Sequence, residues 1–599
     1  MASSTKKQDF DTIYEMTGAF RTYQLWLFIM GAVAGLLAVD VMYINFVSFN
    51  MDHWCKVDEI QHLPFDLQKE IAIPMETISG TSDEAYSSCN RFDLDYNLTD
   101  EQFLNWNRTL YENAERVPCD SWTYDQSEYA YSAVNRFGLV CGNAWQADFI
   151  STINILGILF GSISFGLLAD RIGRKWCVLG SLAVKSVGGL ISAFAPYWSV
   201  LLVGRFINGF GSVAAYDITV MYLMENVGPR YRSWTGEIFA VAFSLGFCLV
   251  PVYALAIRDY TSLQIIMSVP SLIIAIMYIF LLPESPRWLL VTGQTKKADD
   301  IVKNMANVNK VELPEDFTLA DFHVKTDDNE KQASFLELMR NAKLRKRALI
   351  SFVLWFSNAL LYYAYSLNAG NLSGNTFLNT FLLAAVEIPA NLLCLAMMNQ
   401  PFLGRRLTNC FALMLAGISG VISIPLIVTG VSPTSVTAMA MVGKLGSTMG
   451  FNGMYIYTSE IFPTEVRAAG LGASSMCARI AGLIGPYVGG LLVQYWAPAM
   501  STVAGILGIS TGLFTLMLPE TLGRNLDDTV NQVDAQSETK GETTKKNLDM
   551  EFSEKAGHIN ETFFNGREKD SSKNNGIKKG HHDFINEKDS NGDIVKLKL

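Results

Sequence analysis

Charged side chains stand within several apolar stretches of this 599-residue chain. An ionisable group in such a stretch is costly to hold away from water, so it usually faces a cavity or an opposite charge. Carboxylates and aromatic rings attract an organic cation, whereas an arginine binds a carboxylate through two parallel hydrogen bonds. The ionisable residues concerned are Asp40, Lys185, Arg205, Asp217, Glu387, Lys444 and Arg479.

Polar and aromatic residues recur at helical spacing around several of these charges, which places them on one face of a helix. The four stripes are Arg205-Asn208-Ser212-Tyr216, Trp355-Asn358-Tyr362-Ser366, Thr380-Ala384-Glu387-Asn391 and Lys444-Thr448-Asn452-Tyr455. Together they predict a hydrated central cavity that binds a small ion. The predicted contacts with this cargo are Arg479, Glu387, Asp40, Tyr216, Trp355, Tyr362 and Lys444.

Structural roles compete with some of these assignments. Glu387 can instead form an ion pair with Arg479 or Lys444 that joins two helices. Lys185 and Asp217 can pair with each other or face a wetted helix end. The residues for which packing or gating competes with cargo contact are Arg205, Tyr216 and Trp355.

Twelve apolar stretches are long enough to cross a bilayer, which takes about twenty residues. The composition agrees, since 17% of the residues are charged, against about a quarter in soluble domains. The stretches lie near 22–49, 146–168, 176–195, 198–224, 233–255, 262–282, 347–367, 377–399, 406–427, 435–459, 466–495 and 499–518. They predict an all-α membrane protein of twelve transmembrane helices in two six-helix halves.

Lysine and arginine gather in the loops on one side of these stretches, which assigns that side to the cytoplasm. Both termini then lie in the cytoplasm, and the long acidic loop 50–145 lies outside the cell. The tail has too little apolar content to form a core, so we expect it to be disordered. The predicted divisions are the N-terminus 1–21, the first half 22–282, a central cytoplasmic loop of short helices 283–346, the second half 347–518 and the tail 519–599.

The exterior loop has two features that fit an extracellular position. Its four cysteines predict two disulfides, whose pairing the sequence leaves open. Two sequons, which begin at Asn97 and Asn107, predict glycosylation on the same side. The cysteines are Cys55, Cys89, Cys119 and Cys141.

The sequence GLLADRIGRK at 166–175 matches the pattern GxxxDRxGRK of the major facilitator superfamily. Gly173 permits a tight turn, and Asp170 with the neighbouring bases can tie helices together by charge-assisted hydrogen bonds that break during transport. The equivalent sequence NQPFLGRR at 399–406 has lost its acid, which predicts a looser second contact. The predicted gating residues are Asp170, Arg171, Arg174, Glu225, Arg232, Glu460, Arg467 and Arg205.

The two predicted halves also repeat each other. Glu225 stands seven residues before Arg232, and Glu460 stands seven before Arg467. Pro-Glu follows the last stretch of each half, at 283–284 and at 519–520. Duplicated halves with the cargo site between them are typical of this transporter architecture.

Over about residues 15–530 the chain resembles the organic cation, anion and carnitine transporter family, the solute carrier 22 type, and within it the carnitine/organic-cation subgroup. The sequences that carry the resemblance are WTYD at 122–125, LVC at 139–141, FLELMR at 335–340, VEIP at 386–389, MVGK at 441–444, YIYTSE at 455–460 and residues 474–486. Seven residues before a proline of the eleventh stretch, the family's cation transporters carry Asp, and its anion and carnitine members carry Arg. Here Arg479 precedes Pro486, which by resemblance argues against a pure cation carrier. Asp40 and Ala215 depart from the carnitine members and leave room for a more cationic cargo.

These observations favour a multi-pass secondary transporter of the plasma membrane for small organic cations or carnitine-like zwitterions. Arg479 and Lys444 motivate an alternative, an organic-anion exchanger. The long tail motivates one of another class, a transporter-like receptor or scaffold. No enzyme or nucleotide-binding signature appears, so we expect no cofactor and no metal, and a sodium or proton gradient as the energy source. The expected partners are the organic ion and the lipid bilayer, with no nucleic acid.

Overall fold

The computed structural model describes most of the chain between residues 8 and 523. The described residues are 8–37, 42–77, 84–96, 114–314, 317–319, 322–323, 335–430, 432–523, 585–588 and 594–597. The chain divides into two units, Met1–Val530 and Asn531–Leu599. Asp40, Asn97 and Asn107 lie outside the described residues, so their predicted roles stay predictions.

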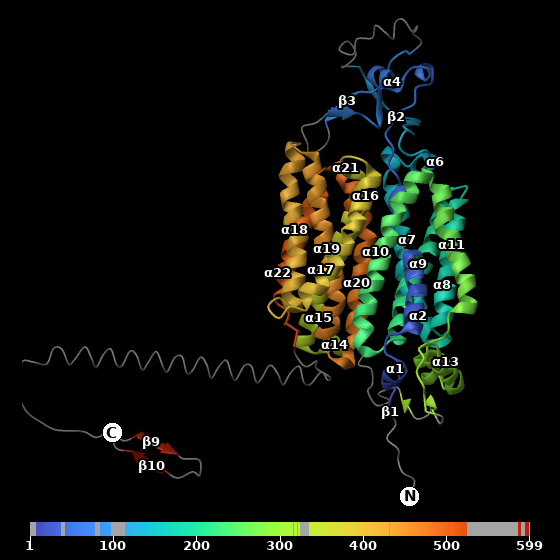
Figure 1. The fold of residues 1–599 in the computed structure, drawn as a ribbon. Helices are drawn as coiled ribbons and strands as arrows, with labels where there is room; N and C mark the ends of the chain where they lie inside the picture. Colours follow the sequence, from blue (N-terminus) through green and yellow to red (C-terminus); the bar gives the residue numbers. More distant parts are fainter. Residues whose placement is uncertain are drawn as a thin grey trace, which may run out of the picture. The chain divides into compact units, whose positions relative to one another are not determined.

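Long helices dominate the first unit (Figure 1). Nine of those in the described part are long and apolar enough to cross a membrane, and α2 and α22 are shorter apolar helices. The helices are α2 Thr22–Leu37, α7 Trp145–Ile172, α8 Arg174–Ala193, α9 Trp198–Glu225, α10 Arg232–Ile257, α11 Tyr260–Leu281, α15 Ala342–Leu367, α16 Thr376–Ala385, α17 Glu387–Met398, α18 Gly404–Thr429, α19 Pro433–Ile461, α20 Thr464–Gly489, α21 Leu491–Tyr495 and α22 Ala499–Thr515.

The long helices pack into two groups (Figure 1). The first group comprises α2 and α7–α11, and the second comprises α15–α20 and α22. Glycines let helices approach closely: a Cβ atom at Gly157 of α7 would overlap the backbone of Phe206 in α9. The two groups meet where α7 packs on α20 and where α10 packs on α16 and α17.

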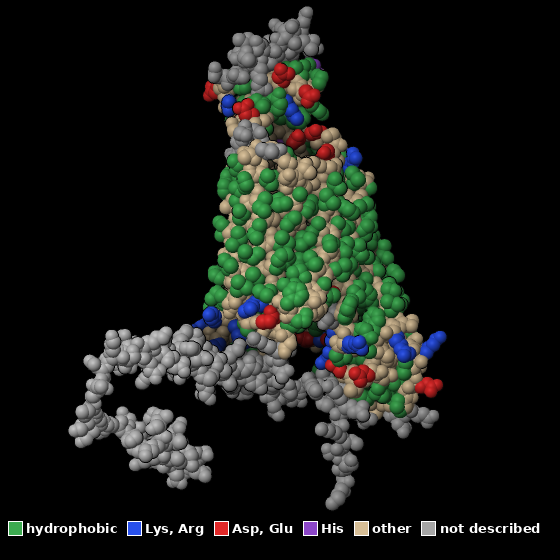
Figure 2. All heavy atoms as spheres, turned by 60° about the vertical axis from the view of Figure 1, so that its left-hand side comes forward, with side chains coloured by type: hydrophobic (Ala, Val, Ile, Leu, Met, Phe, Trp, Pro, Cys, Tyr) green, Lys and Arg blue, Asp and Glu red, His purple; other side chains and the backbone are tan. Residues whose placement is uncertain are grey.

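The surface between the two ends of this unit is apolar. Figure 2 shows hydrophobic side chains over the middle of the bundle, with the charged side chains gathered at its two ends. Large side chains such as Phe280 of α11 and Leu167 of α7 are exposed there. Such a belt of exposed apolar side chains suits contact with lipid rather than with water.

The apolar stretch predicted at 377–399 forms two helices, α16 and α17, separated at Val386. Pro389 explains the break. It has no backbone N–H to donate, and its ring crowds the carbonyl of the residue four positions earlier, which is Ala385. Because the break falls here, Glu387 becomes the first residue of α17 inside the bundle.

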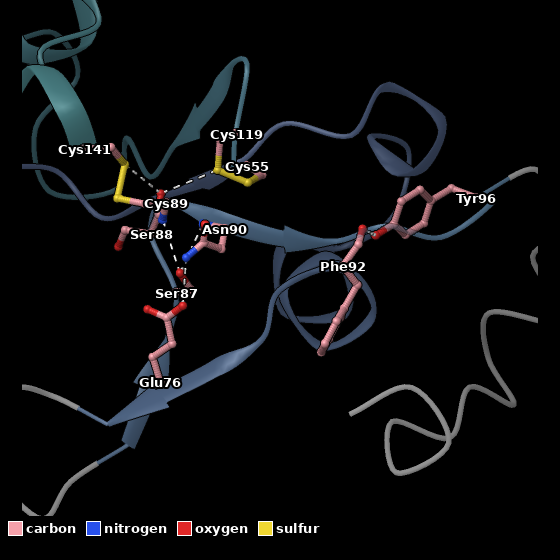
Figure 3. The surroundings of a disulfide bond; sticks show 10 residues. All are labelled: Cys55, Glu76, Ser87, Ser88, Cys89, Asn90, Phe92, Tyr96, Cys119 and Cys141. Carbon is pink, nitrogen blue, oxygen red and sulfur yellow. Dashed lines mark hydrogen bonds between the residues drawn. A yellow bond between two sulfur atoms is a disulfide. The ribbon is translucent and has the colours of Figure 1, made fainter. Parts of the chain in front are cut away.

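One end of the bundle, called the loop end below, carries the cysteine-rich segment (Figure 1). Its strands pair as three antiparallel ladders; the disulfide Cys55–Cys119 links two of them, and Cys89–Cys141 links this segment to the residues before α7 (Figure 3). Both disulfides expected from the sequence are therefore present, and the structure supplies their pairing. The elements are α3 Ile44–Val47, α4 Phe65–Ala72, α6 Ala133–Phe137 and the strand pairs β2 His53–Cys55 with β7 Trp122–Tyr124, β3 Met75–Thr77 with β4 Glu84–Tyr86, and β5 Asn90–Phe92 with β6 Arg116–Pro118.

The opposite end, called the motif end below, carries the GRK sequence and the short helices (Figure 1). These helices agree with the expectation for residues 283–346. The elements are α1 Thr12–Thr17, α12 Pro286–Val291, α13 Thr295–Val308, α14 Phe335–Arg340 and the parallel pair β1 Gln8–Asp9 with β8 Phe322–His323.

The segment after α22 differs from the expectation of a disordered tail that begins at 519. Tyr457 donates a hydrogen bond to the carbonyl of Pro519, 2.8 Å away, so this segment packs on the second group. Within the second unit, β9 Ile585–Lys588 and β10 Ile594–Leu597 form an antiparallel pair where no strand is predicted. The low apolar content of the tail did not predict this contact, because hydrogen bonds to distant residues hold residues 519–523 in place.

Candidate functional site

A cavity of about 780 Å³ lies between the two helix groups. It reaches from Glu387 of α17 to Glu225, Arg232 and Arg287 at the motif end. Residues of α7, α9 and α10 line one wall, and residues of α15, α17, α19 and α20 line the other. The cavity is large enough for a small organic molecule and lies where the sequence predicts a cargo site.

Glu387 is the centre of a buried cluster beside this cavity. Its carboxylate pairs with Lys444 of α19 at 2.7 Å, and accepts hydrogen bonds from Tyr362 at 2.8 Å and Ser244 at 3.1 Å. The ammonium group of Lys444 also lies 3.4 Å from the centre of the Tyr362 ring. Lys444 is fully buried and donates to Ser366, so it acts as the structural partner of Glu387. Of the two partners proposed for Glu387, the structure selects Lys444.

Arg479 forms a second ion pair, with Asp217. Its Nη2 lies 3.1 Å from Oδ2 of Asp217, and both residues line the cavity. The pair joins α9 of the first group to α20 of the second. The predicted pairing of Asp217 with Lys185 is therefore wrong. Lys185 instead donates to Ser271 and to the carbonyl of Leu37, because α8 lies against α11 rather than against the cavity.

Aromatic rings line much of the cavity wall. Tyr216 and Tyr362 are among them, as the sequence predicts. Trp355 is not among the described residues that line it. Its indole donates to Thr458 at 2.8 Å, and its ring packs edge-on against Tyr455, which covers it from the cavity. The assignment of Trp355 as a direct cargo contact is thus corrected to the packing role. The further aromatic lining residues are Phe243, Tyr363, Phe451 and Tyr455.

Glu237 of α10 also lines the cavity, although it is not among the cargo contacts that the sequence predicts. It lies two helical turns from Ser244 on the same face of α10, toward the motif end. In the ranges that the structure describes, no lysine or arginine lies within ion-pair distance of its carboxylate. The spacing Gly236, Ala240, Ser244 along α10 is the signal that could have identified this face.

At the motif end of the first group, four residues form what is called the Arg174 cluster: Arg174, Glu225, Glu284 and Ser285. Arg174 pairs with Glu225 at 3.0 Å, and Ser285 donates to Glu225 at 2.6 Å. Glu284 accepts from the backbone N–H groups of Arg174 and Lys175. Burial outweighs these bonds and raises the pKa of Glu284 above its usual value. Asp170, as predicted, also pairs with Arg174, at 3.2 Å.

The second group repeats this arrangement in the Arg405 cluster: Arg405, Glu460, Glu520 and Thr521. Arg405 pairs with Glu460 at 3.2 Å, and Thr521 donates to Glu460 at 2.6 Å. Glu520 accepts from the backbone N–H groups of Arg405 and Arg406. Asn399 accepts from Arg405 at 3.3 Å, so a neutral amide acceptor takes the place of the missing carboxylate. The Arg405–Glu460 distances of 3.2–3.4 Å are longer than the Arg174–Glu225 distances of 3.0–3.1 Å, and the acid is absent, so the looser second contact stays a prediction that these distances favour.

The other predicted gating residues have different partners. Arg232 pairs with Asp11 of the N-terminal segment at 2.6 Å. Arg205 is fully buried and donates to the hydroxyl of Tyr43 at 2.8 Å, which favours its structural alternative. Arg467 donates to a backbone carbonyl of its own turn, and Arg171 is exposed. These positions spread over both ends of the bundle, so they do not form one gate.

Comparison with known proteins identifies the family to which this chain belongs. Residues 102–532 match the family described as Sugar (and other) transporter. An organic cation transporter protein of Drosophila melanogaster is 36% identical over 454 residues, which cover 74% of this chain and 80% of the relative. The chain belongs to the solute carrier 22 family of organic cation transporters.

Other solute carrier 22 relatives cover still more of the chain. Human solute carrier family 22 member 2 is 29% identical over 535 residues, 88% of this chain and 95% of the relative. Among solved structures, the proton:xylose symporter XylE matches with a TM-score of 0.55 at 14% identity, over 84% of this chain and 98% of that chain. The latter likeness shows the major facilitator fold. Family and fold are those of transporters, not enzymes.

Proposed function

We propose that the protein is a plasma-membrane secondary transporter of small organic cations and of carnitine-like zwitterions. The observation that supports this proposal is the charge of the central cavity. Its two deep cations are each held by a carboxylate, Arg479 by Asp217 and Lys444 by Glu387. Glu237 has no such counter-charge in the described chain, so it offers an unpaired carboxylate to a molecule in the cavity.

A cation gains from such a cavity in two ways. The carboxylate of Glu237 attracts it through a low-dielectric space. The rings of Tyr216 and Phe243, which lie 5.3 Å apart between centroids on the same wall, offer aromatic faces to a quaternary or protonated amine. The organic cation names of the relatives agree with this preference.

Within this proposal the bundle has twelve spans in two six-helix halves, with both termini in the cytoplasm and the cysteine-rich loop outside. The cargo crosses by alternating access. Contacts that join the helix groups at the loop end support an inward-facing arrangement: Asp148 accepts from the N–H of Leu491 at 2.8 Å, and Thr152 donates to the carbonyl of Leu483 at 3.3 Å. At the motif end the cavity reaches Glu225, Arg232 and Arg287.

An organic-anion exchanger remains the second candidate, because Arg479 lines the cavity. Its guanidinium is bound to Asp217, which weakens this candidate. In the proposed transporter a sodium or proton gradient drives the transport and no cofactor takes part, whereas the exchanger would use a dicarboxylate gradient.

Tracer uptake in cells tests the proposal directly. Tetraethylammonium, carnitine and benzoate are compared, each with and without sodium and at two external pH values. We expect uptake of the first two and not of benzoate. Benzoate uptake that preloaded dicarboxylate stimulates, without tetraethylammonium uptake, would replace the proposal with the exchanger.

A matched pair of variants tests the role of Glu237. Glu237→Gln keeps the size of the side chain and removes its charge, so tetraethylammonium uptake should fall about tenfold, which corresponds to ~1.4 kcal/mol. Glu15→Gln is the control, because Glu15 is exposed on α1 outside the cavity. An equal effect of both variants would remove Glu237 from the cargo site.

A further inference from the structure

The ion pair between Asp217 and Arg479 stands in an unusual position for a purely structural contact. It joins the two helix groups, and it lies in the wall of the cavity itself. The side chain of Asp217 is 40% exposed and that of Arg479 is 15% exposed. A molecule in the cavity can therefore touch the pair, and it meets the carboxylate more readily than the guanidinium.

All three nitrogens of the Arg479 guanidinium are already bonded. Nη2 donates to Asp217 at 3.1 Å, Nε donates to Ser162 of α7 at 3.1 Å, and Nη1 donates to the carbonyl of Ser475 at 3.2 Å and to its hydroxyl. A guanidinium binds a carboxylate best through two adjacent N–H groups at once. While the ion pair is intact, Asp217 holds one edge of the fork and Ser162 another, so no pair of donors is left for an organic anion.

We propose that Asp217 is a specificity-determining residue, which occupies Arg479 and thereby excludes organic anions from the cavity. This inference rests on the proposed transport function of the same cavity. The exposed oxygen of Asp217 is at the same time available to the head group of a cation. One ion pair thus gives the site its preference for cations, although the chain carries an arginine there.

The other buried ion pair, between Glu387 and Lys444, shows why Asp217 alone has this role. Lys444 is fully buried behind Glu387 and also bonded to Ser366, so removal of Glu387 would leave its ammonium group inside the protein. Arg479 lines the cavity and needs no movement of a helix to become accessible. Removal of the charge from Asp217 therefore exposes a cation to the cargo, whereas removal of Glu387 does not.

Uptake of benzoate, an aryl monocarboxylate, tests the inference in the full-length protein. Asp217→Asn keeps the side-chain volume and releases Arg479, so benzoate uptake should rise at least tenfold above the wild type while tetraethylammonium uptake falls. In the double variant D217N/R479Q the gain should disappear. A gain that persists in the double variant, or no gain in D217N protein that reaches the cell surface, would overturn the proposal.

Two further variants test the same proposal if the D217N protein folds poorly. The variant D217R/R479N places the arginine on α9 and removes the acid, so it should also gain benzoate uptake, whereas D217R/R479D restores a pair and should not. Thermal stabilisation of the purified variants by benzoate gives a readout that does not depend on transport. Failure of wild-type tetraethylammonium uptake would count against the transport function, while benzoate gain in these variants tests Asp217 separately.

Discussion

The Arg174 cluster and the Arg405 cluster are built alike from the same kinds of residue, with serine in one replaced by threonine in the other. In each, an arginine at the start of a helix pairs with a glutamate near the end of another, a hydroxyl donates to that glutamate, and a second glutamate caps the backbone. Even the buried tyrosines Tyr222 and Tyr457 repeat, since each donates to the carbonyl of the proline before the capping glutamate. The repeated geometry follows from repeated residues that equivalent helices place in the same way.

The two clusters differ in what covers them. Tyr14 of α1 donates to the carbonyl of Glu225, and Asp11 holds Arg232 and Arg287, so the N-terminal segment packs on the Arg174 cluster. The described residues place no such segment on the Arg405 cluster. In this covered cluster, burial raises the pKa of Glu284. At Glu520 burial also opposes ionisation, but four backbone N–H groups outweigh it and lower the pKa. The same motif is thus charged more readily where it is less covered.

The largest loss of stability should follow from removal of Arg174 or Arg405. Arg174→Ala leaves Glu225 without its partner in a largely buried place, which costs about 3–5 kcal/mol of unfolding free energy. Arg405→Ala should cost less, because its cluster lacks the cover of α1. The midpoint of thermal unfolding in detergent measures both, with Arg171→Ala as the exposed control. Equal losses would show that the cover does not matter.

A smaller difference should separate the two hydroxyls. Ser285→Ala and Thr521→Val each remove a 2.6 Å hydrogen bond to a carboxylate, worth about 1.5–3 kcal/mol. Ser285 also caps α12 by accepting from the N–H of Trp288, which adds about 1 kcal/mol to its loss. Unfolding midpoints of the two variants check the order, and a larger loss for Thr521→Val would contradict it.

The capping glutamates should respond to pH with opposite signs. Glu520 stabilises the fold above its unfolded pKa, and this contribution is lost as pH falls through its lowered folded pKa. Glu284 has a raised folded pKa, so the wild type loses stability as pH rises through the window above the unfolded pKa. Relative to wild type, Glu520→Gln should therefore become less stable with rising pH, and Glu284→Gln more stable. Unfolding midpoints between about pH 3 and 7 test this, with the Glu520 effect below the usual glutamate pKa of about 4.3 and the Glu284 effect above it, and slopes of the same sign would contradict it.

The smallest change in stability should come from Asp170, an acid beside Arg174 that has no counterpart beside Arg405. Asp170 is 69% exposed, so Asp170→Asn should cost less than about 1 kcal/mol. Asn399→Asp restores an acid beside Arg405 and should gain no more than that. The unfolding midpoints of both variants are measured in low and high salt, since screening of the charges by salt should abolish both changes in stability. Effects that are independent of salt would assign the difference to packing.

Local patterns predicted much of the architecture. The apolar stretches around α7 to α11 agree with the helices within a few residues, because a run of apolar side chains follows from the chain alone. The cysteines predicted two disulfides but not their pairing. The charges in the apolar stretches were found as a set, yet the partners of Asp217 and Lys185 were not, and Glu237 was missed because a single acid near a helix start resembles a solvated one.

What the sequence determined by itself is the membrane-spanning helical class, the duplicated motifs and the family, since these depend on composition and on residues close together along the chain. Only the tertiary structure decided which charges neutralise each other. Asp217 and Arg479 are 262 positions apart and belong to different helix groups. Their meeting depends on how α9 and α20 pack across the cavity, and on that contact rests the proposed exclusion of organic anions.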